Sequence, residues 1–301
     1  MGWKKILGYF IALILIALLV FYWVFPHINF GTASSRNYNF SLGASPNSSM
    51  QFYDNLRYSG KNISYSILDC PIGKKDEMKT AFDIIENLTI LNFYTVNENE
   101  EISVTCDEKN RVEGGLFIGG EGGPTNISQS GSFNVIFHGT ILLIRESDCE
   151  RPNIALHELL HALGFNHSEN KNNIMYPVSK CSQVISQDIL DTINSLYSVP
   201  SLPDLLFENI SATMNGRYLY SNLTIRNNGF KEAPNGVIEV YADGKKIQDI
   251  EFGPLLAGQG RIMINNIFVL QKSINELRFF INADFEELEK ENNEAILKYK
   301  S

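Results

Sequence analysis

The chain has 301 residues, of which 44% are hydrophobic and 20% are charged, so it has enough apolar side chain for packed cores and is not intrinsically disordered. A chain of this length favours two folded domains. The net charge of −9 argues against nucleic acid or an anionic membrane surface as the main partner, because both would repel an acidic protein.

The first segment predicts a membrane anchor. Lys4 and Lys5 precede an apolar run over residues 6–25, which is about as long as a helix that crosses a hydrocarbon core. A cleaved signal peptide has a shorter apolar core, roughly 7–15 residues, so we favour a retained transmembrane helix over cleavage. The lysines stay inside under the positive-inside rule. The predicted protein is therefore single-pass in the cell membrane, with residues 1–5 cytoplasmic, residues 6–25 in the membrane and the chain that follows them extracellular.

The segment after the apolar run, residues 26–50, is rich in Ser, Asn and Gly and predicts a flexible stalk. The pattern then becomes that of a globular domain over residues 51–199. We predict no regular element in the glycine-dense GGLFIGGEGGP at 114–124. Elsewhere apolar periodicity predicts strands at 62–68, 102–105, 133–137 and 141–144, and helices at 75–94, 153–163 and 186–197, the last with Ser186 as N-cap.

A second domain is predicted over residues 200–301, after a linker that reads Pro-Ser-Leu-Pro at 200–203. Alternating runs at 218–225, 237–241 and 262–269 are typical of strands. Turn signals such as Asp243–Gly244 separate them, and this spacing indicates an antiparallel β-sandwich.

The four cysteines, an even number, suit an oxidising compartment. Three pairings are open, with reduced core thiols as the alternative. We favour Cys70–Cys106 and Cys149–Cys181, because the second pair would connect the segment before the 153–163 helix to the chain just past residues 174–177.

The residues with metal-binding chemistry lie in HELLHALGFNH at 157–167. On a helix, His157 and His161 project from one face on successive turns. Gly164 can end the helix in a left-handed conformation and bring His167 back to the same ion. Three imidazoles leave one position of a zinc ion open, which is the arrangement of catalytic sites. Glu158 lies beside His157, where it could act as general base and then acid.

This segment, followed by Ser168 and by Met175–Tyr176–Pro177, resembles the metzincin zinc peptidases, and within them the matrixin-like branch. ISQDILDTINSLY at 185–197 is similar to the helix that closes their catalytic domain. The resemblance implies an α/β (α+β) domain with a twisted mixed sheet, an active-site helix and a substrate cleft over the zinc. It also implies that Met175 forms an apolar floor beneath the imidazoles. Tyr176 is either a pocket residue or a packing residue.

The departures from that family are informative. Matrixins typically carry a second, structural zinc, but only His138 is at hand here outside the motif and His27. We therefore predict a single catalytic Zn²⁺, with no metal role for either of those histidines. No cysteine precedes Cys70, so latency through a cysteine thiolate is not expected.

The second domain resembles the immunoglobulin-like CARDB family of cell-surface adhesion domains. The residues that carry this resemblance are LPDL at 202–205, RNNG at 226–229, GPLLAGQG at 253–260 and NADFEELEKENNEA at 282–295. It implies a module for a cell-surface partner, with a simple spacer as the alternative. The terminal acids could bind Ca²⁺, but we favour a solvated loop for them.

The sequence thus predicts a membrane-anchored extracellular zinc endopeptidase that acts on peptides or proteins, with no nucleic-acid partner. Two other functions stay open. One is a surface adhesin that has lost turnover, against which the intact Glu158 argues. The other is a zinc hydrolase of non-peptide amides, which the motif does not exclude.

Overall fold

A computed structural model describes residues 2–24, 27–42, 50–109, 111–271 and 273–299. The chain divides into two compact units. The α/β unit comprises residues 38–203 together with 228–231. The sandwich unit comprises residues up to 37, 204–227 and 232 onward. Each unit is described by itself.

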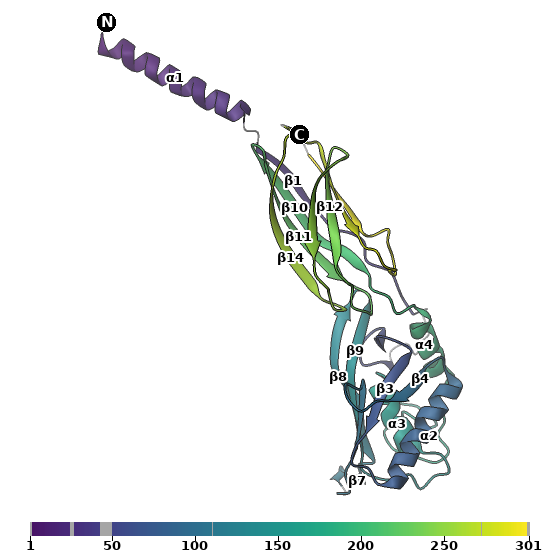
Figure 1. The fold of residues 1–301 in the computed structure, drawn as a ribbon. Helices are drawn as coiled ribbons and strands as arrows, with labels where there is room; N and C mark the ends of the chain where they lie inside the picture. Colours follow the sequence, from purple (N-terminus) through teal and green to yellow (C-terminus); the bar gives the residue numbers. More distant parts are fainter. Residues whose placement is uncertain (1, 25–26, 43–49, 110, 272, 300–301) are drawn as a thin grey trace. The chain divides into compact units, whose positions relative to one another are not determined.

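The α/β unit is built on a six-stranded mixed sheet (Figure 1). Strand β9 is central, because it pairs in parallel with β2 and β5 and antiparallel with β8. Strands β5, β3 and β4 continue the sheet in parallel. Strand β8 is the edge beyond β9. The bounds are β2 (Leu56–Tyr58), β3 (Asn62–Ile67), β4 (Asn92–Thr95), β5 (Ile102–Cys106), β8 (Gly120–Ser130) and β9 (Phe133–Leu143).

Three helices accompany this sheet: α2 (Ile72–Leu88), α3 (Asn153–Ala162) and α4 (Gln187–Ser198). Helices α3 and α4 lie within one residue of their predicted bounds, whereas α2 ends at Leu88 and the last residues of the helix predicted over 75–94 belong to β4. Helix α2 buries Met78, Ala81, Phe82 and Ile85 at three- and four-residue intervals, as a helix packed along one face must. Ser186 precedes α4 as predicted, but its side chain makes no capping bond and instead accepts a hydrogen bond from the Asn173 amide. The positions of these helices therefore depend mainly on the local pattern of apolar residues.

The expectation that residues 114–124 form no regular element was wrong. A small hairpin, β6 (Val112–Glu113) and β7 (Leu116–Phe117), precedes β8, which begins at Gly120. The glycines of β8 allow α3 to approach this strand closely, and they do not form a loop. A Cβ added at Gly120 would lie 2.7 Å from Cγ of Glu158, because α3 packs directly on β8 at this point.

Both predicted disulfides are confirmed. Cys70 is bonded to Cys106, and Cys149 to Cys181. The second bond joins the segment before α3 to the segment after Met175. The Asn153 amide reinforces the same connection by donating to the Lys180 carbonyl at 2.7 Å.

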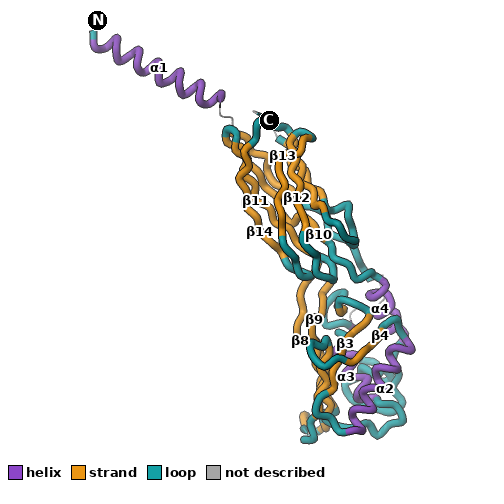
Figure 2. The backbone as a smooth tube through the Cα atoms, viewed as in Figure 1, coloured by secondary structure: helices purple, strands orange, loops and turns teal. Residues whose placement is uncertain are grey.

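The sandwich unit consists of two four-stranded antiparallel sheets, drawn in orange in Figure 2. Apolar side chains from both sheets alternate into one shared core that includes Phe207, Leu223, Val240 and Phe279. The first sheet is β1 (His27–Ala33), β10 (Leu205–Asn215), β11 (Tyr218–Asn227) and β14 (Gly260–Phe268); the second is β13 (Lys245–Phe252), β12 (Gly236–Ala242), β15 (Glu276–Asn282) and β16 (Glu294–Lys298).

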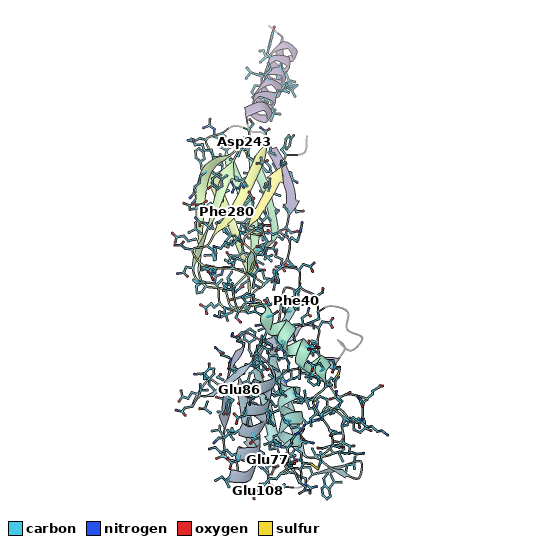
Figure 3. The ribbon with its side chains drawn as sticks, turned by 90° about the vertical axis from the view of Figure 1, so that its right-hand side faces the viewer. Phe40, Glu77, Glu86, Glu108, Asp243 and Phe280 are labelled. Atoms are coloured by element: carbon cyan, nitrogen blue, oxygen red, sulfur yellow. A yellow bond between two sulfur atoms is a disulfide. The ribbon has the colours of Figure 1, made fainter. Side chains whose placement is uncertain are left out.

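The Asp243–Gly244 turn signal is confirmed as the connection between β12 and β13. Asp243 has a φ of 46° and Gly244 a φ of 79°, the left-handed conformations that a tight hairpin turn requires. The Asp243 carboxylate, labelled in Figure 3, accepts the backbone N–H groups of Asn275 and Glu276 at 3.0 Å. One side chain thus joins the hairpin to the start of β15.

Part of the predicted stalk is a strand. Residues His27–Ala33 form β1, which pairs antiparallel with β10. Ile28 and Phe30 alternate into the sandwich core, at 7% and 4% exposed. The polar composition of this segment obscures the alternation of its few apolar residues. These residues become buried only when the segment pairs with β10, a strand far along the chain. Residues 43–49 of the predicted stalk lie outside the described residues.

The predicted transmembrane helix is a second correction. Helix α1 (Trp3–Val24) occupies the segment at which residues 6–25 were expected to cross a membrane. Among the described residues, however, no helix combines the length and the apolar character that a crossing demands. That part of the fold prediction was wrong.

Candidate metal centre

Three imidazoles converge in the α/β unit. Nε2 of His161 lies 3.0 Å from Nε2 of His157 and 3.1 Å from Nε2 of His167. The possible ligand atoms of this group all lie within 4.8 Å of one another. Tetrahedral zinc with bonds of about 2.0–2.1 Å separates its nitrogen ligands by about 3.3 Å, so the group has the size that one zinc ion needs.

The other ring nitrogens determine which face is free for a metal. Nδ1 of His157 lies 2.7 Å from the Ile174 carbonyl, and Nδ1 of His161 lies 2.7 Å from the Phe165 carbonyl. A carbonyl oxygen only accepts, so each Nδ1 carries the proton and each Nε2 presents a lone pair. Lone pairs facing one another at this distance repel unless a cation lies between them. The donor set therefore fits zinc.

The turn that brings His167 close to the other two histidines begins at Gly164. Its φ of 101° is open to glycine and strained for other residues. The Gly164 N–H donates to the His161 carbonyl, and the Phe165 N–H donates to the Leu160 carbonyl, so α3 ends at this point. The sequence prediction of a left-handed helix end is confirmed.

Burial keeps the imidazoles neutral at pH 7. Desolvation lowers the pKa of His161 to about 4, with the neighbouring His157 as the next cause. Desolvation likewise lowers the pKa of His157 and of His167. A neutral imidazole is the form that binds a metal, so no proton has to leave before the ion enters.

Glu158 lies on α3 beside His157 and is 6% exposed. Burial and, as the second cause, the Glu121 carboxylate together raise the pKa of its carboxyl group to about 8. A bound cation acts in the opposite direction and favours the carboxylate. Glu158 therefore has the environment of a group that can both accept and return a proton.

A cleft of about 800 Å³ is lined by the three convergent histidines and by Glu158. The edge strand β8 lines it through Gly120 and Gly122, and the segment after Met175 lines it through Pro177 and Val178. The Cys149–Cys181 disulfide also lines this cleft. The wall that follows Met175 is thus covalently attached to the segment that leads into α3.

Met175 is fully buried, and its turn supports the metal ligands through the backbone. The Met175 carbonyl accepts the Ser168 N–H at 2.9 Å, and the preceding Ile174 carbonyl holds the His157 ring. Tyr176 is half-buried and, within the described part of the chain, is not among the residues that line the cleft. The packing alternative fits Tyr176 better than a pocket role.

The remaining histidines lie elsewhere. His138 is on β9, where its ring contacts the hydroxyl groups of Ser103 and Thr125 at 3.0 and 2.8 Å. His27 is on β1 in the other unit. Phe52 was not predicted as a site residue, but its ring stacks on His161 with centroids 5.8 Å apart. No spacing rule connects residues so far apart along the chain.

Gly122 controls how closely α3 approaches β8. A Cβ there would collide with the backbone of Glu158, which cannot move aside as a flexible side chain could. We expect Gly122→Ala to destabilise the unit by about 1–3 kcal/mol and to weaken zinc binding, because α3 must shift. Urea unfolding and zinc titration measure both effects.

The matched control is Gly123→Ala, since a Cβ at Gly123 meets nothing within 4 Å. Equal effects of the two substitutions would contradict a close approach at Gly122.

Comparisons with known proteins agree with this geometry. Residues 57–198 match the family model of the matrixins, Peptidase_M10. Stromelysin-1 of Rattus norvegicus is 48% identical over 59 residues, which cover 18% of this chain and 12% of that protein. Stromelysin-1 of Mus musculus is 46% identical over the same length and coverage. The similarity therefore spans about an eighth of the length of these relatives.

Among solved structures, the chain is similar to the CARDB domain of a Pyrococcus furiosus protein in complex with di-metal ions. The identity is 18%, the TM-score is 0.28, and the match covers 33% of this chain and 87% of that one. A likeness at this TM-score carries no conclusion about function.

The matrixin match covers the sheet, α2, α3 with its histidines, and α4. The matrixin family implies zinc, and the three imidazoles provide a place for it. Over residues 57–198, the chain is therefore similar to the matrixin family of metallopeptidases.

Proposed function

We propose that the chain is a zinc-dependent endopeptidase with one catalytic zinc ion, and that Glu158 is its general base and acid. The observation that carries this proposal is the convergence of three neutral imidazoles in the cleft that also holds the buried Glu158. A structural zinc site is closed by four protein ligands, whereas this group offers three.

Zinc in this site would supply Lewis-acid chemistry, which polarises a carbonyl and makes water more acidic. Glu158 takes the proton of a water molecule as that water attacks the peptide carbonyl. The same carboxyl group then donates the proton to the leaving amine. Burial raises the pKa of Glu158 and a bound zinc ion would lower it, and these opposing effects suit a group that first accepts and then donates the proton.

The substrate is a peptide or protein in extended form. Strand β8 is an edge strand whose only described strand partner is β9, and its Gly120 and Gly122 line the cleft. An edge strand offers backbone donors and acceptors that an extended chain can pair with. A peptide lying along β8 would pass the three imidazoles.

The two disulfides support a working location in an oxidising compartment outside the cytoplasm. The Cys149–Cys181 bond lines the cleft, so the shape of the site depends on that environment.

Chelation tests the proposal. The full chain is incubated with an unfolded protein, with and without a zinc chelator, and cleavage is followed by mass spectrometry of the fragments. We expect cleavage that stops on chelation and returns when Zn²⁺ is added in excess. The His161→Ala variant should not recover, because it lacks one of the three ligands.

Cleavage that persists in chelator and in the variant would contradict a zinc mechanism. Binding of the unfolded protein without any fragment would support the adhesin instead. Release of a non-peptide amide with intact polypeptide would support the hydrolase alternative.

A further inference from the structure

A buried group of oxygen-bearing side chains lies in the sandwich unit, whereas the histidine site belongs to the α/β unit. Asp204 immediately precedes β10, and Glu287, Asn292 and Asn293 lie in the segment between β15 and β16. We propose that these four side chains form a binding site for a divalent cation, Ca²⁺ by its chemistry.

Hydrogen bonds join the four side chains into one group. The Asn292 amide donates to Oδ1 of Asp204 at 3.1 Å, and the Asn293 amide donates to Oε1 of Glu287 at 2.7 Å. Oε2 of Glu287 accepts the N–H of Leu205, the residue after Asp204, at 2.7 Å. These hydrogen bonds connect the two carboxylates and the two amides into one group beside the first residue of β10.

The group is almost completely removed from solvent. Asp204 is 0% exposed, Glu287 8%, Asn292 4% and Asn293 3%. Three of its oxygens have no hydrogen-bond donor: Oδ2 of Asp204 and Oδ1 of each asparagine. The Glu289 backbone N–H lowers the pKa of Asp204 but does not complete a hydrogen bond to Oδ2. A buried acceptor without a donor destabilises the fold, so three such oxygens in one group indicate that a cation is missing from it.

Charge leads to the same conclusion. No ion pair links Asp204 or Glu287 to a lysine or arginine among the described residues. Burial raises the pKa of Asp204 to about 6, and burial likewise raises the pKa of Glu287. Lys290 acts on Glu287 only through its charge and forms no ion pair with it, so both carboxylates lie in a dry site without a directly bound cationic side chain.

The ligand atoms select the cation. They are carboxylate and amide oxygens, with no nitrogen or sulfur ligand among them, which suits a hard ion and not zinc. Four side chains from two segments can adjust to the larger and more flexible coordination sphere of Ca²⁺. Mg²⁺ demands a stricter octahedron and gives up its water reluctantly.

A cation at this site would join the two sheets. Asp204 leads into β10 of one sheet, while the other three residues lie next to β15 and β16 of the second sheet. The Asp204 N–H also donates to the Asn227 side chain at the end of β11. Occupancy should therefore raise the stability of the sandwich unit without any effect on the chemistry at His157 and Glu158.

Calorimetric titration of the full chain, loaded with zinc so that the histidines are occupied, tests the proposal with CaCl2 and with MgCl2 as probes. We expect saturable one-to-one binding of Ca²⁺, weaker binding of Mg²⁺, and a higher unfolding temperature in Ca²⁺ than in EGTA. Asp204→Asn should weaken Ca²⁺ binding at least about tenfold, since charge and ligand count set affinity in such sites. The matched control is Glu286→Gln, which removes an exposed charge from the same segment and should change little.

Asn292→Asp keeps the test decisive if Asp204→Asn fails to fold. A third carboxylate should lower stability in EGTA by repulsion from Asp204, and Ca²⁺ should restore that stability and bind more tightly. A purely structural hydrogen-bond network would be damaged by this change and would not be rescued by Ca²⁺. Absence of saturable binding, or equal loss with Glu286→Gln, overturns the proposal.

Discussion

Replacing Glu158 with Gln is expected to lower turnover by about 10²–10⁴-fold while zinc stays bound. The amide has the size of the carboxyl group and fills the same buried space, but it cannot accept a proton from water. Glu158 is also not one of the three convergent ligands, so the metal site remains intact. Measurement requires initial rates on a peptide substrate together with metal analysis of the same sample.

Glu121→Gln is the appropriate control for this change. Its carboxylate acts on Glu158 only through charge and raises the pKa of that group. Removing it should leave most of the activity, because no proton passes through Glu121. Comparable losses in both variants would mean that Glu158 acts through the electrostatics of the cleft and not as the proton carrier.

Replacing Arg57 with Met is expected to destabilise the α/β unit by at least about 2 kcal/mol. Arg57 is 0% exposed, and its guanidinium group donates to the carbonyls of Leu196 and Val199 at the end of α4. It also donates to the carbonyls of Tyr58 and Ser59 and lies over the ring of Phe230, 4.0 Å from the centroid. Methionine fills much of the volume but removes the donor that Arg57 provides to the Leu196 and Val199 carbonyls.

Desolvation of the charge offsets part of this loss, and burial lowers the pKa of Arg57 to about 10. The comparison is Arg111→Met, which removes exposed ion pairs to Asp107 and Glu121 and should change the free energy of unfolding by less than about 1 kcal/mol. Urea unfolding of both variants measures the difference. If the two unfold alike, Arg57 does not hold α4 to the sheet.

The metal site could be predicted from the sequence because it depends on local geometry. His157 and His161 are one helical turn apart, and Gly164 ends that helix in a conformation that glycine favours. Each of these rules connects residues within a few positions. Helix α2 and strand β3 followed for the same reason, since their periodicity is contained within the segment itself.

Features that depend on distant contacts were missed or left open. Gly120 and Gly122 were interpreted as loop residues, yet they belong to a strand that needs glycine because α3 packs against it. Strand β1 was interpreted as a stalk, because Ile28 and Phe30 become core residues only when β10 lies beside them.

The sequence by itself determined the chemistry of the histidine site, the turn at Gly164 and the alternating pattern of a sandwich. Only the tertiary structure decided among the cysteine pairings, placed Arg57 at the end of α4, and brought Asp204 together with Glu287 from segments next to strands of different sheets. The physical reason is range: dihedral preferences and helical spacing act over a few residues, whereas burial is a property of the assembled core.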